Sequence, residues 1–160
     1  PQVARELTSF EYVGHTDEVV AIALIPAPQI SEKTASMSEE TMNPALGSPR
    51  KNDEVMLFSA SLDNTMRCWD EYDVTERFRM KEEESEISCM IPLSHLNLLV
   101  TGNDDGSIRW WNPDLGSLTS ATHHDNTVCC LAHAPTSREE YLLSGSYDGS
   151  IGLWVMGRAR

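Results

Sequence analysis

The chain has 160 residues, of which 25 are acidic and 12 are basic, so its formal net charge at pH 7 is -13. An acidic surface of this kind repels phosphate backbones and argues against direct binding of nucleic acid. No run of 18 apolar residues is present and the first twenty residues do not resemble a signal peptide, so we expect no membrane segment and an intracellular, cytoplasmic or cytoskeletal location.

The chain begins with a lead-in followed by an apolar strand. Residues 1–13 are expected to form the lead-in, with an edge strand at 10–13. Residues 18–26 are predicted to form an inner strand, because their apolar side chains are nearly continuous. Such a run is typical of a strand that is covered on both faces.

An insertion at residues 27–54 interrupts the pattern. This segment is rich in Ser, Pro, Glu and Met and has no sustained apolar period, so we expect it to be disordered or loosely attached. Ser48 begins a Ser-Pro-Arg-Lys segment that is typical of sites for proline-directed kinases. The alternative is a linker with no regulatory meaning.

The rest of the chain alternates short β-rich runs with turns. The expected strands are 55–59, 65–69, 77–80, 88–91, 98–101, 107–111, 118–121, 128–132, 141–144 and 150–154. Three hairpins are centred on Asp63-Asn64, Asp105-Gly106 and Asp148-Gly149, pairs that favour a short type I′ turn. The acidic run at 81–86 is either a site for a basic partner or a solvated loop.

Three residue classes recur in phase along the chain: a hydroxyl residue, an aspartate and a tryptophan. The three sets are Ser59, Asp63 and Trp69; Thr101, Asp105 and Trp111; and Ser144, Asp148 and Trp154. The tryptophans are 42 and 43 residues apart. A period of this length predicts stacked supersecondary units.

This pattern resembles the WD-repeat family, whose four-stranded blades form a β-propeller. The resemblance implies an all-β fold: a partial propeller of three four-stranded antiparallel blades at about 14–80, 81–122 and 123–156. Closed propellers have about 4 to 8 blades. The chain is therefore expected to be a fragment of a larger propeller, or half of a ring assembled from two copies.

The resemblance also implies a hydrogen-bonded His, Ser/Thr, Asp and Trp tetrad in each blade. His15 and His124 would complete the sets of the first and third blades. The middle blade has Glu83 at the aligned position, so we expect an incomplete tetrad. On that argument Asp105→Ala should destabilise the chain less than Asp148→Ala.

No residue is assigned to catalysis, metal binding or a cofactor. His123-His124-Asp125 lacks a third ligand at a familiar spacing, and the tetrad gives His124 a structural role. Of the adjacent tryptophans, Trp111 should join its tetrad and Trp110 should pack on a neighbour. The cysteines are expected to be buried free thiols in strands: Cys68, Cys89, Cys129 and Cys130.

The resemblance implies a non-enzymatic scaffold that presents loops to other proteins in a multiprotein assembly, for which a cytoskeletal or ciliary setting is one option. Its partners would be proteins with basic segments, and the remaining blades, from the same chain or a second copy. The expected contact residues lie on the narrow face of the ring: Leu62, Asp104, Tyr147, Glu18, Glu86 and Thr127.

The alternative function is that of a substrate receptor of a ubiquitin ligase. Family members of that type carry an Arg two residues after the Trp-Asp pair that ends a strand. This Arg is absent after Trp69, Trp111 and Trp154, which argues against that function.

Overall fold

The computed structural model describes residues 9–26, 55–81, 85–113, 118–136 and 139–157. The insertion at 27–54, with Ser48, lies outside the described residues, and so does Glu83. Within the described ranges, no helix is long and apolar enough to cross a membrane.

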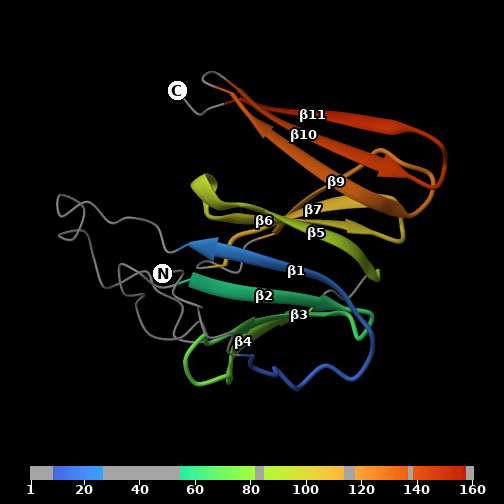
Figure 1. The fold of residues 1–160 in the computed structure, drawn as a ribbon. Helices are drawn as coiled ribbons and strands as arrows, with labels where there is room; N and C mark the ends of the chain where they lie inside the picture. The colour runs from blue at the N-terminus through green and yellow to red at the C-terminus, as the bar shows by residue number, and fades with distance from the viewer. Residues whose placement is uncertain (1–8, 27–54, 82–84, 114–117, 137–138, 158–160) are drawn as a thin grey trace, which may run out of the picture.

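The described strands form three antiparallel sheets (Figure 1), and the all-β prediction is confirmed. The first sheet has the order β1 (Val19–Pro26), β2 (Val55–Ser61), β3 (Thr65–Trp69) and β4 (Glu76–Lys81). The second has the order β5 (Ile87–Leu93), β6 (Leu98–Asn103), β7 (Ser107–Trp111) and β8 (Leu118–Thr122), with a 3-10 turn, η3 (Ser94–Leu96), between β5 and β6. The third contains β9 (Val128–Pro135), β10 (Glu139–Ser146) and β11 (Ile151–Gly157), so three strands of the expected four are described.

The sheets stack with β1 beside β5 and β5 beside β9 (Figure 1). One apolar core lies between the first two sheets and includes Phe58 and Ile87. A second core joins the last two sheets, where Val100 and Ile108 pack with Leu142. Burying a side chain of this size stabilises the fold by roughly 1.5–3 kcal/mol. The middle sheet therefore depends on both of its neighbours.

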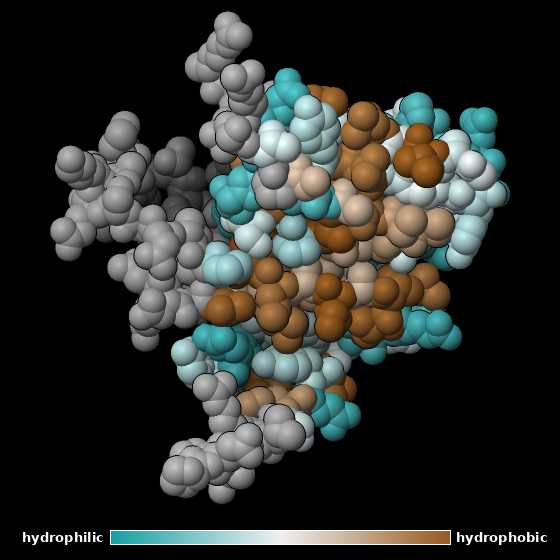
Figure 2. Space-filling view, turned by 45° about the horizontal axis from the view of Figure 1, so that its top comes forward, coloured by the Kyte–Doolittle hydropathy of each residue, from teal (hydrophilic) through white to brown (hydrophobic). Residues whose placement is uncertain are grey.

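One face of the third sheet remains open. Leu143 of β10 is paired with Leu153 of β11, and both are exposed, as are Ile151 and Val155. Figure 2, turned so that the top of the view in Figure 1 comes forward, shows hydrophobic side chains gathered on the visible face. Cys130 lies on the open face of the third sheet, opposite Gly145, which explains why this cysteine is exposed.

The prediction of four buried thiols was only partly right. All four cysteines are free, but Cys129 and Cys130 are exposed: Cys130 lies on the uncovered outer face of the third sheet, and Cys129 lies where the register of β9 shifts. Cys68 is buried and Cys89 is partly buried. Burial raises the pKa of the Cys89 thiol to about 11, so this group stays protonated and unreactive near neutral pH.

The three hairpin turns share a geometry that differs from the expected type I′. Asn64, Gly106 and Gly149 have φ values of 62°, 81° and 85°, whereas the aspartates before them do not have positive φ. A type I′ turn requires positive φ at both central residues. The backbone N–H of Gly106 donates to Asn103 O at 3.3 Å, and the other two turns repeat this bond. Each turn is a three-residue loop that ends in a left-handed residue.

The expected edge strand at 10–13 is absent. Phe10 and Val13 are exposed, and the ring of Tyr12 packs edge-on against Trp69 with centroids 5.7 Å apart. A strand needs a neighbouring edge for its backbone hydrogen bonds, and no described strand pairs with this segment. The strand prediction for 10–13 was therefore wrong.

The adjacent tryptophans point to opposite faces of β7. Trp111 is buried and donates from Nε1 to Thr101 Oγ1 at 3.0 Å. Trp110 packs edge-on against Trp154 of the third sheet, with centroids 5.8 Å apart. The buried Nε1 of Trp110 finds no hydrogen-bond partner among the described residues.

Gly106→Ala should destabilise the chain more than Gly149→Ala. Both substitutions place a side chain at positive φ, at a cost of about 1 kcal/mol each. A Cβ at Gly106 would also clash with the backbone carbonyl of His124, whereas a Cβ at Gly149 meets no atom within 4 Å. We expect an additional loss of about 1–3 kcal/mol for Gly106→Ala in urea denaturation. Equal losses would contradict this packing.

Trp110→Phe should cost less than Trp111→Phe. Both changes remove a similar volume, but only Trp111→Phe breaks a hydrogen bond. Removing an unpaired buried donor offsets part of the lost packing. We expect a difference of about 1–2 kcal/mol in the free energy of unfolding measured by urea denaturation. A larger loss for Trp110→Phe would show that its indole N–H is paired in solution.

Candidate functional site

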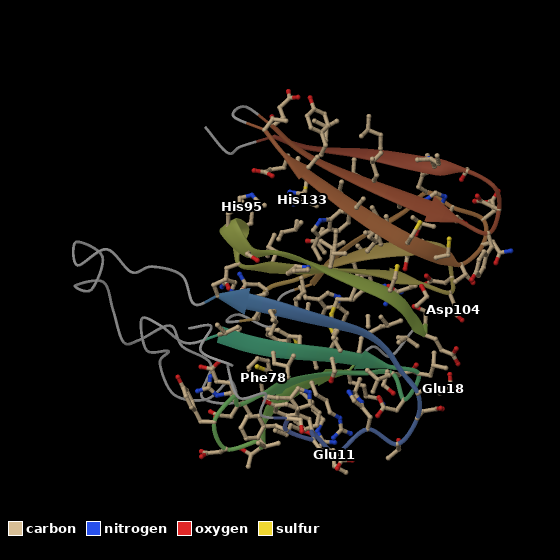
Figure 3. The ribbon with its side chains drawn as sticks, in the orientation of Figure 1. Glu11, Glu18, Phe78, His95, Asp104 and His133 are labelled. Atoms are coloured by element: carbon tan, nitrogen blue, oxygen red, sulfur yellow. The ribbon has the colours of Figure 1, made fainter. Side chains whose placement is uncertain are left out.

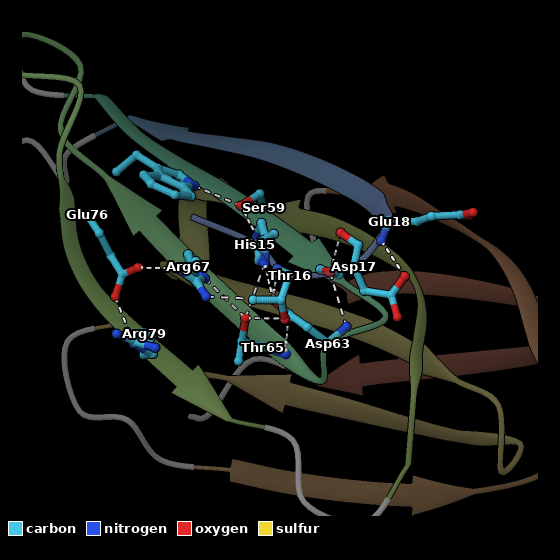
Figure 4. A network of polar contacts seen from close by, with 12 residues as sticks. His15, Thr16, Asp17, Glu18, Ser59, Asp63, Thr65, Arg67, Glu76 and Arg79 are labelled. Atoms are coloured by element: carbon cyan, nitrogen blue, oxygen red, sulfur yellow. Dashed lines mark hydrogen bonds and ion pairs between the residues drawn. The ribbon is translucent and has the colours of Figure 1, made fainter. Parts of the chain in front are cut away.

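The first sheet holds a polar network behind its hairpin turn (Figure 4). Trp69 Nε1 donates to Ser59 Oγ at 2.7 Å, and this oxygen lies 2.7 Å from His15 Nε2. His15 Nδ1 lies 2.9 Å from Asp63 Oδ2. An ionised carboxylate only accepts, so Nδ1–H donates to Asp63, and in the neutral ring Nε2 accepts from Ser59. The Ser59 oxygen thus has a structural role and is not placed as a nucleophile.

Asp63 is the centre of this network. It also accepts from the Thr65 backbone N–H at 2.9 Å, the Thr65 hydroxyl at 2.5 Å and the Thr16 N–H at 3.1 Å. Arg67 Nη2 lies 3.6 Å from its carboxylate. Burial would raise the pKa of Asp63, but the hydrogen bonds from Thr65, His15 and Thr16 outweigh burial and hold the pKa well below its usual range.

The third sheet has the same network, except that a serine hydroxyl lies between the histidine and the aspartate. Trp154 Nε1 donates to Ser144 Oγ at 2.9 Å, and this oxygen lies 2.7 Å from His124 Nε2. His124 Nδ1 lies 2.7 Å from Ser150 Oγ and 3.4 Å from Asp148 Oδ2. Hydrogen bonds from Ser150 and from the Asp125 N–H lower the pKa of Asp148. The hydroxyl of Ser150 therefore joins the histidine to the turn.

In the described network of the middle sheet, an amide and a hydroxyl group lie between the threonine and the turn aspartate. Thr101 accepts from Trp111 and donates to Asn103 Oδ1 at 3.0 Å. Asn103 Nδ2 donates to Ser85 Oγ at 2.9 Å, and Ser85 also bonds to Asp105. Asn103 and Ser85 thus connect the tryptophan to the turn aspartate, as histidine does in the other sheets.

Asp105 also has a charged partner, Arg109, at the position that Arg67 takes beside Asp63. Arg109 Nη2 donates to Asp105 Oδ2 at 2.9 Å, and the guanidinium is almost fully buried. Burial would raise the pKa of Asp105, but bonds from Ser107, the Arg109 charge and Ser85 lower it. Removing Asp105 would take a counter-ion from a buried Arg, so the absence of His is no reason to expect a small effect of Asp105→Ala.

The sequence analysis missed one regular feature of these networks. The residue two positions after each turn aspartate carries a hydroxyl group: Thr65, Ser107 and Ser150. Each of these residues donates its backbone N–H to that aspartate, at 2.9, 2.9 and 2.7 Å. The repeated Asp-x-Ser/Thr spacing was a visible signal for this role.

The structure joins the six expected contact residues into three equivalent pairs. Each pair links the first turn residue to the start of an inner strand: Leu62 N to Glu18 O at 3.0 Å, Asp104 N to Glu86 O at 2.9 Å, and Tyr147 N to Thr127 O at 3.0 Å. Glu18 and Asp104 lie at the same end of the sheets in Figure 3. We call this end the turn rim. Tyr147 is 72% exposed, whereas Leu62 and Thr127 are partly buried.

The turn rim is acidic. Its exposed carboxylates belong to Asp17, Glu18, Glu86, Asp104, Asp105 and Asp125. The rim segments 16–18, 62–64, 85–86, 104–106, 125–127 and 147–149 contain no Lys or Arg. Arg67 and Arg109, which lie behind the turns, are buried and paired with carboxylates. The rim therefore carries a negative potential that favours basic ligands.

Asp63→Asn should weaken the acid dependence of stability. A carboxyl whose pKa is lowered by folding stabilises the fold above its unfolded pKa of about 3.9, and this contribution is lost as pH falls toward the folded pKa. We expect Asp63→Asn to cost about 1.5–3 kcal/mol at pH 7 and to flatten the decline between about pH 4 and pH 2. Urea denaturation across this range tests the prediction. Asp17→Asn, in the same loop, is the control, and an unchanged pH profile for Asp63→Asn would contradict the network.

The comparisons with known proteins identify the repeat. The family model described as "WD domain, G-beta repeat" matches residues 50–70, 76–112 and 116–155, which is more than half of the chain. These stretches end close to Trp69, Trp111 and Trp154, the tryptophans that close the three networks.

Several curated relatives carry names from ribosome biogenesis. The chain is 30% identical over 109 residues to the ribosome biogenesis protein WDR12 homolog of Ixodes scapularis, covering 64% of this chain and 24% of the relative. It is 33% identical to YTM1 of Vanderwaltozyma polyspora, with 64% and 23% covered, and 31% identical to ytm1 of Aspergillus oryzae, with 64% and 22% covered.

The chain spans about a quarter of the length of these relatives. Their names give no support to a ciliary or ubiquitin-ligase role. The three matched repeats, the stacked antiparallel sheets and the networks behind their turns lead to one conclusion: the chain belongs to the WD-repeat family.

Proposed function

We propose that this chain is a non-enzymatic part of a WD-repeat propeller whose acidic turn rim binds basic segments of partner proteins during ribosome assembly. The observation that carries the proposal is the set of three equivalent backbone hydrogen bonds at that rim. They hold three turns of successive blades in the same orientation. A rigid row of turns loses little conformational entropy on binding, which favours use as a docking surface.

The chemistry of the rim supports a basic protein segment as the ligand. The turn rim carries exposed carboxylates as well as Tyr147, and an exposed tyrosine offers a large contact area at low entropic cost. The same carboxylates would repel an RNA backbone. We therefore assign the turn rim to protein, and the expectation that the chain does not bind nucleic acid directly stays a prediction.

The absence of enzymatic activity is also a proposal, and the polar networks support it. A serine hydrolase would need an exposed serine whose oxygen can attack a substrate. Ser59 and Ser144 are buried, and each accepts a hydrogen bond from a tryptophan indole. The Ser, His and Asp of these blades are therefore arranged as supports for the turns.

The setting of ribosome assembly is suggested by the names of the relatives. It implies a multiprotein assembly and a nuclear or nucleolar location. In this proposal the blades at about 14–80, 81–122 and 123–156 are completed by further blades, from the same polypeptide or a second copy. The exposed Leu143 and Leu153 of the third sheet would pack against such a blade.

Density-gradient sedimentation of the tagged full-length protein tests this setting. Co-sedimentation with ribosome precursor particles, lost after the particles are dissociated in high salt, is the expected result. Recovery with a ubiquitin-ligase adaptor or with axonemal fractions, and not with precursors, would contradict the proposal.

Neutralising the turn rim should weaken binding of a basic peptide. We expect Glu18→Gln, Glu86→Gln and Asp104→Asn together to reduce the affinity for a fluorescent Lys/Arg-rich peptide in anisotropy titrations. Three exposed ion pairs at roughly 0.2–1 kcal/mol each correspond to about a three- to 150-fold loss. The effect should shrink as salt is raised.

A matched control distinguishes the effect of the rim carboxylates on peptide affinity from the effect of the net charge of the chain. Glu11→Gln, Asp73→Asn and Glu139→Gln together change the net charge equally, at exposed positions outside the turn rim. This triple variant should retain the affinity of the unmodified chain. Equal losses in both triple variants would show that only overall charge attracts the peptide, and the rim would not be the binding site.

A further inference from the structure

A second cluster of polar side chains lies away from the turn rim, at the opposite end of the sheets (Figure 3). His95 is in the η3 turn of the second sheet, whereas His133 is in β9 and Glu140 in β10 of the third. Their potential ligand atoms all lie within 4.8 Å of one another. We call these three residues the His-Glu-His cluster.

The carboxylate of Glu140 lies between the two imidazole rings. His95 Nε2 is 2.8 Å from its Oε1, and His133 Nε2 is 2.8 Å from its Oε2. The rings are stacked, with centroids 5.3 Å apart and planes inclined by 14°. The Glu140 side chain is 3% exposed, that of His133 is 13% exposed and that of His95 is 41% exposed. The cluster is therefore closed on the protein side and open to solvent at His95.

The cluster buries a negative charge. The Glu140 side chain is almost fully buried, and each of its two carboxylate oxygens lies 2.8 Å from the Nε2 atom of a histidine. A buried carboxylate is costly unless it is paired with a positive charge. A divalent cation would supply this charge.

We propose that His95, His133 and Glu140 bind a zinc ion that joins the second blade to the third. Two imidazole nitrogens and one carboxylate form a donor set that zinc accepts, with a fourth position left for water. Calcium and magnesium prefer oxygen ligands, so the two histidines favour zinc. This site is independent of the proposed function of the turn rim.

The geometry needs only small adjustments to accept the ion. Tetrahedral zinc with bonds of about 2.0–2.1 Å separates its ligand atoms by roughly 3.4 Å, and the cluster's ligand atoms already lie within 4.8 Å of one another. In the metal-free cluster each Nε2–H faces Glu140. Zinc binds a ring nitrogen through its lone pair, so each Nε2 that binds the ion must carry no proton.

The consequence would be a cross-link between two sheets that, among the described residues, meet through side-chain packing, hydrogen bonds and the contact of His95 with Glu140. His95 belongs to the second sheet, and the other two ligands to the third. The apolar core of these sheets includes Leu93 and Leu142, close in sequence to ligand residues. A ligand that binds only the folded state raises stability in proportion to the logarithm of its concentration.

Calorimetric titration of the metal-free chain with Zn²⁺ tests the proposal. We expect one saturable site, and His95→Gln and Glu140→Gln should each reduce the affinity by at least about tenfold. His95→Gln changes an exposed turn residue, so this variant should fold. His123→Gln is the matched control, because it exchanges another exposed histidine outside the cluster and should leave zinc binding unchanged.

Two further measurements exclude the exposed cysteines. Cys129 and Cys130 also offer metal ligands, so the double variant Cys129→Ser, Cys130→Ser should bind zinc as the unmodified chain does. Bound Co²⁺ should give a tetrahedral spectrum without sulfur-to-metal charge transfer. Zinc should also raise the melting temperature of the unmodified chain but not that of His95→Gln.

Three outcomes would overturn the assignment. The first is the absence of a saturable site in the unmodified chain. The second is unchanged affinity in both His95→Gln and Glu140→Gln. The third is loss of binding in the cysteine double variant together with a cobalt–thiolate band, which would place the metal on Cys129 and Cys130 instead.

Discussion

The burial of apolar sheet faces between neighbouring blades is the constraint on which the rest of this structure depends. Each sheet is too small to cover both of its own faces, and a repeat unit of this kind gains its core from its neighbours. The middle sheet meets this requirement twice, through Phe58 and Ile87 on one side and Val100 and Leu142 on the other. The third sheet meets it once, because Leu143 and its neighbours on the outer face are exposed. The polar networks and both candidate sites lie on this stacked framework.

The polar networks solve a second problem created by the stacking. Tight turns at the end of a blade leave backbone N–H groups and polar side chains close to the core, where unpaired groups are costly. In each blade an aspartate accepts the N–H of the residue two positions later, and a tryptophan closes the network from behind. The three networks differ in the residue that lies between the hydroxyl group and the aspartate. This residue is His15 in the first sheet and His124 in the third, and Asn103 with Ser85 takes its place in the second. The turn is held in place by different chemistry in each blade, and the shape of the rim is the same.

The two ends of the sheets differ in chemistry. At the turn rim, backbone hydrogen bonds fix a row of exposed carboxylates, and Arg67 and Arg109 are buried behind it. At the opposite end, Glu140 is buried between two histidines from different blades. An exposed carboxylate row suits a mobile basic ligand that associates and dissociates. A buried carboxylate beside two imidazoles suits a metal ion that remains bound as part of the fold. The proposed partner surface and the proposed zinc site thus follow from the degree of burial of the same functional group.

The sequence by itself determined the repeat, the turn residues and the strand positions other than the one expected at 10–13, because strand patterning and Asp-Gly turns depend on neighbours along the chain. It also placed the turn-rim residues such as Leu62 and Tyr147 in equivalent positions, since the repeat carries them in phase. Only the tertiary structure decided that Asn103 and Ser85 occupy the histidine's place in the middle blade, that Cys130 is exposed, and that His95 meets Glu140. The physical reason is that these contacts depend on how separate sheets stack and which faces stay uncovered, and no local pattern in the chain encodes which side chains of different blades will meet.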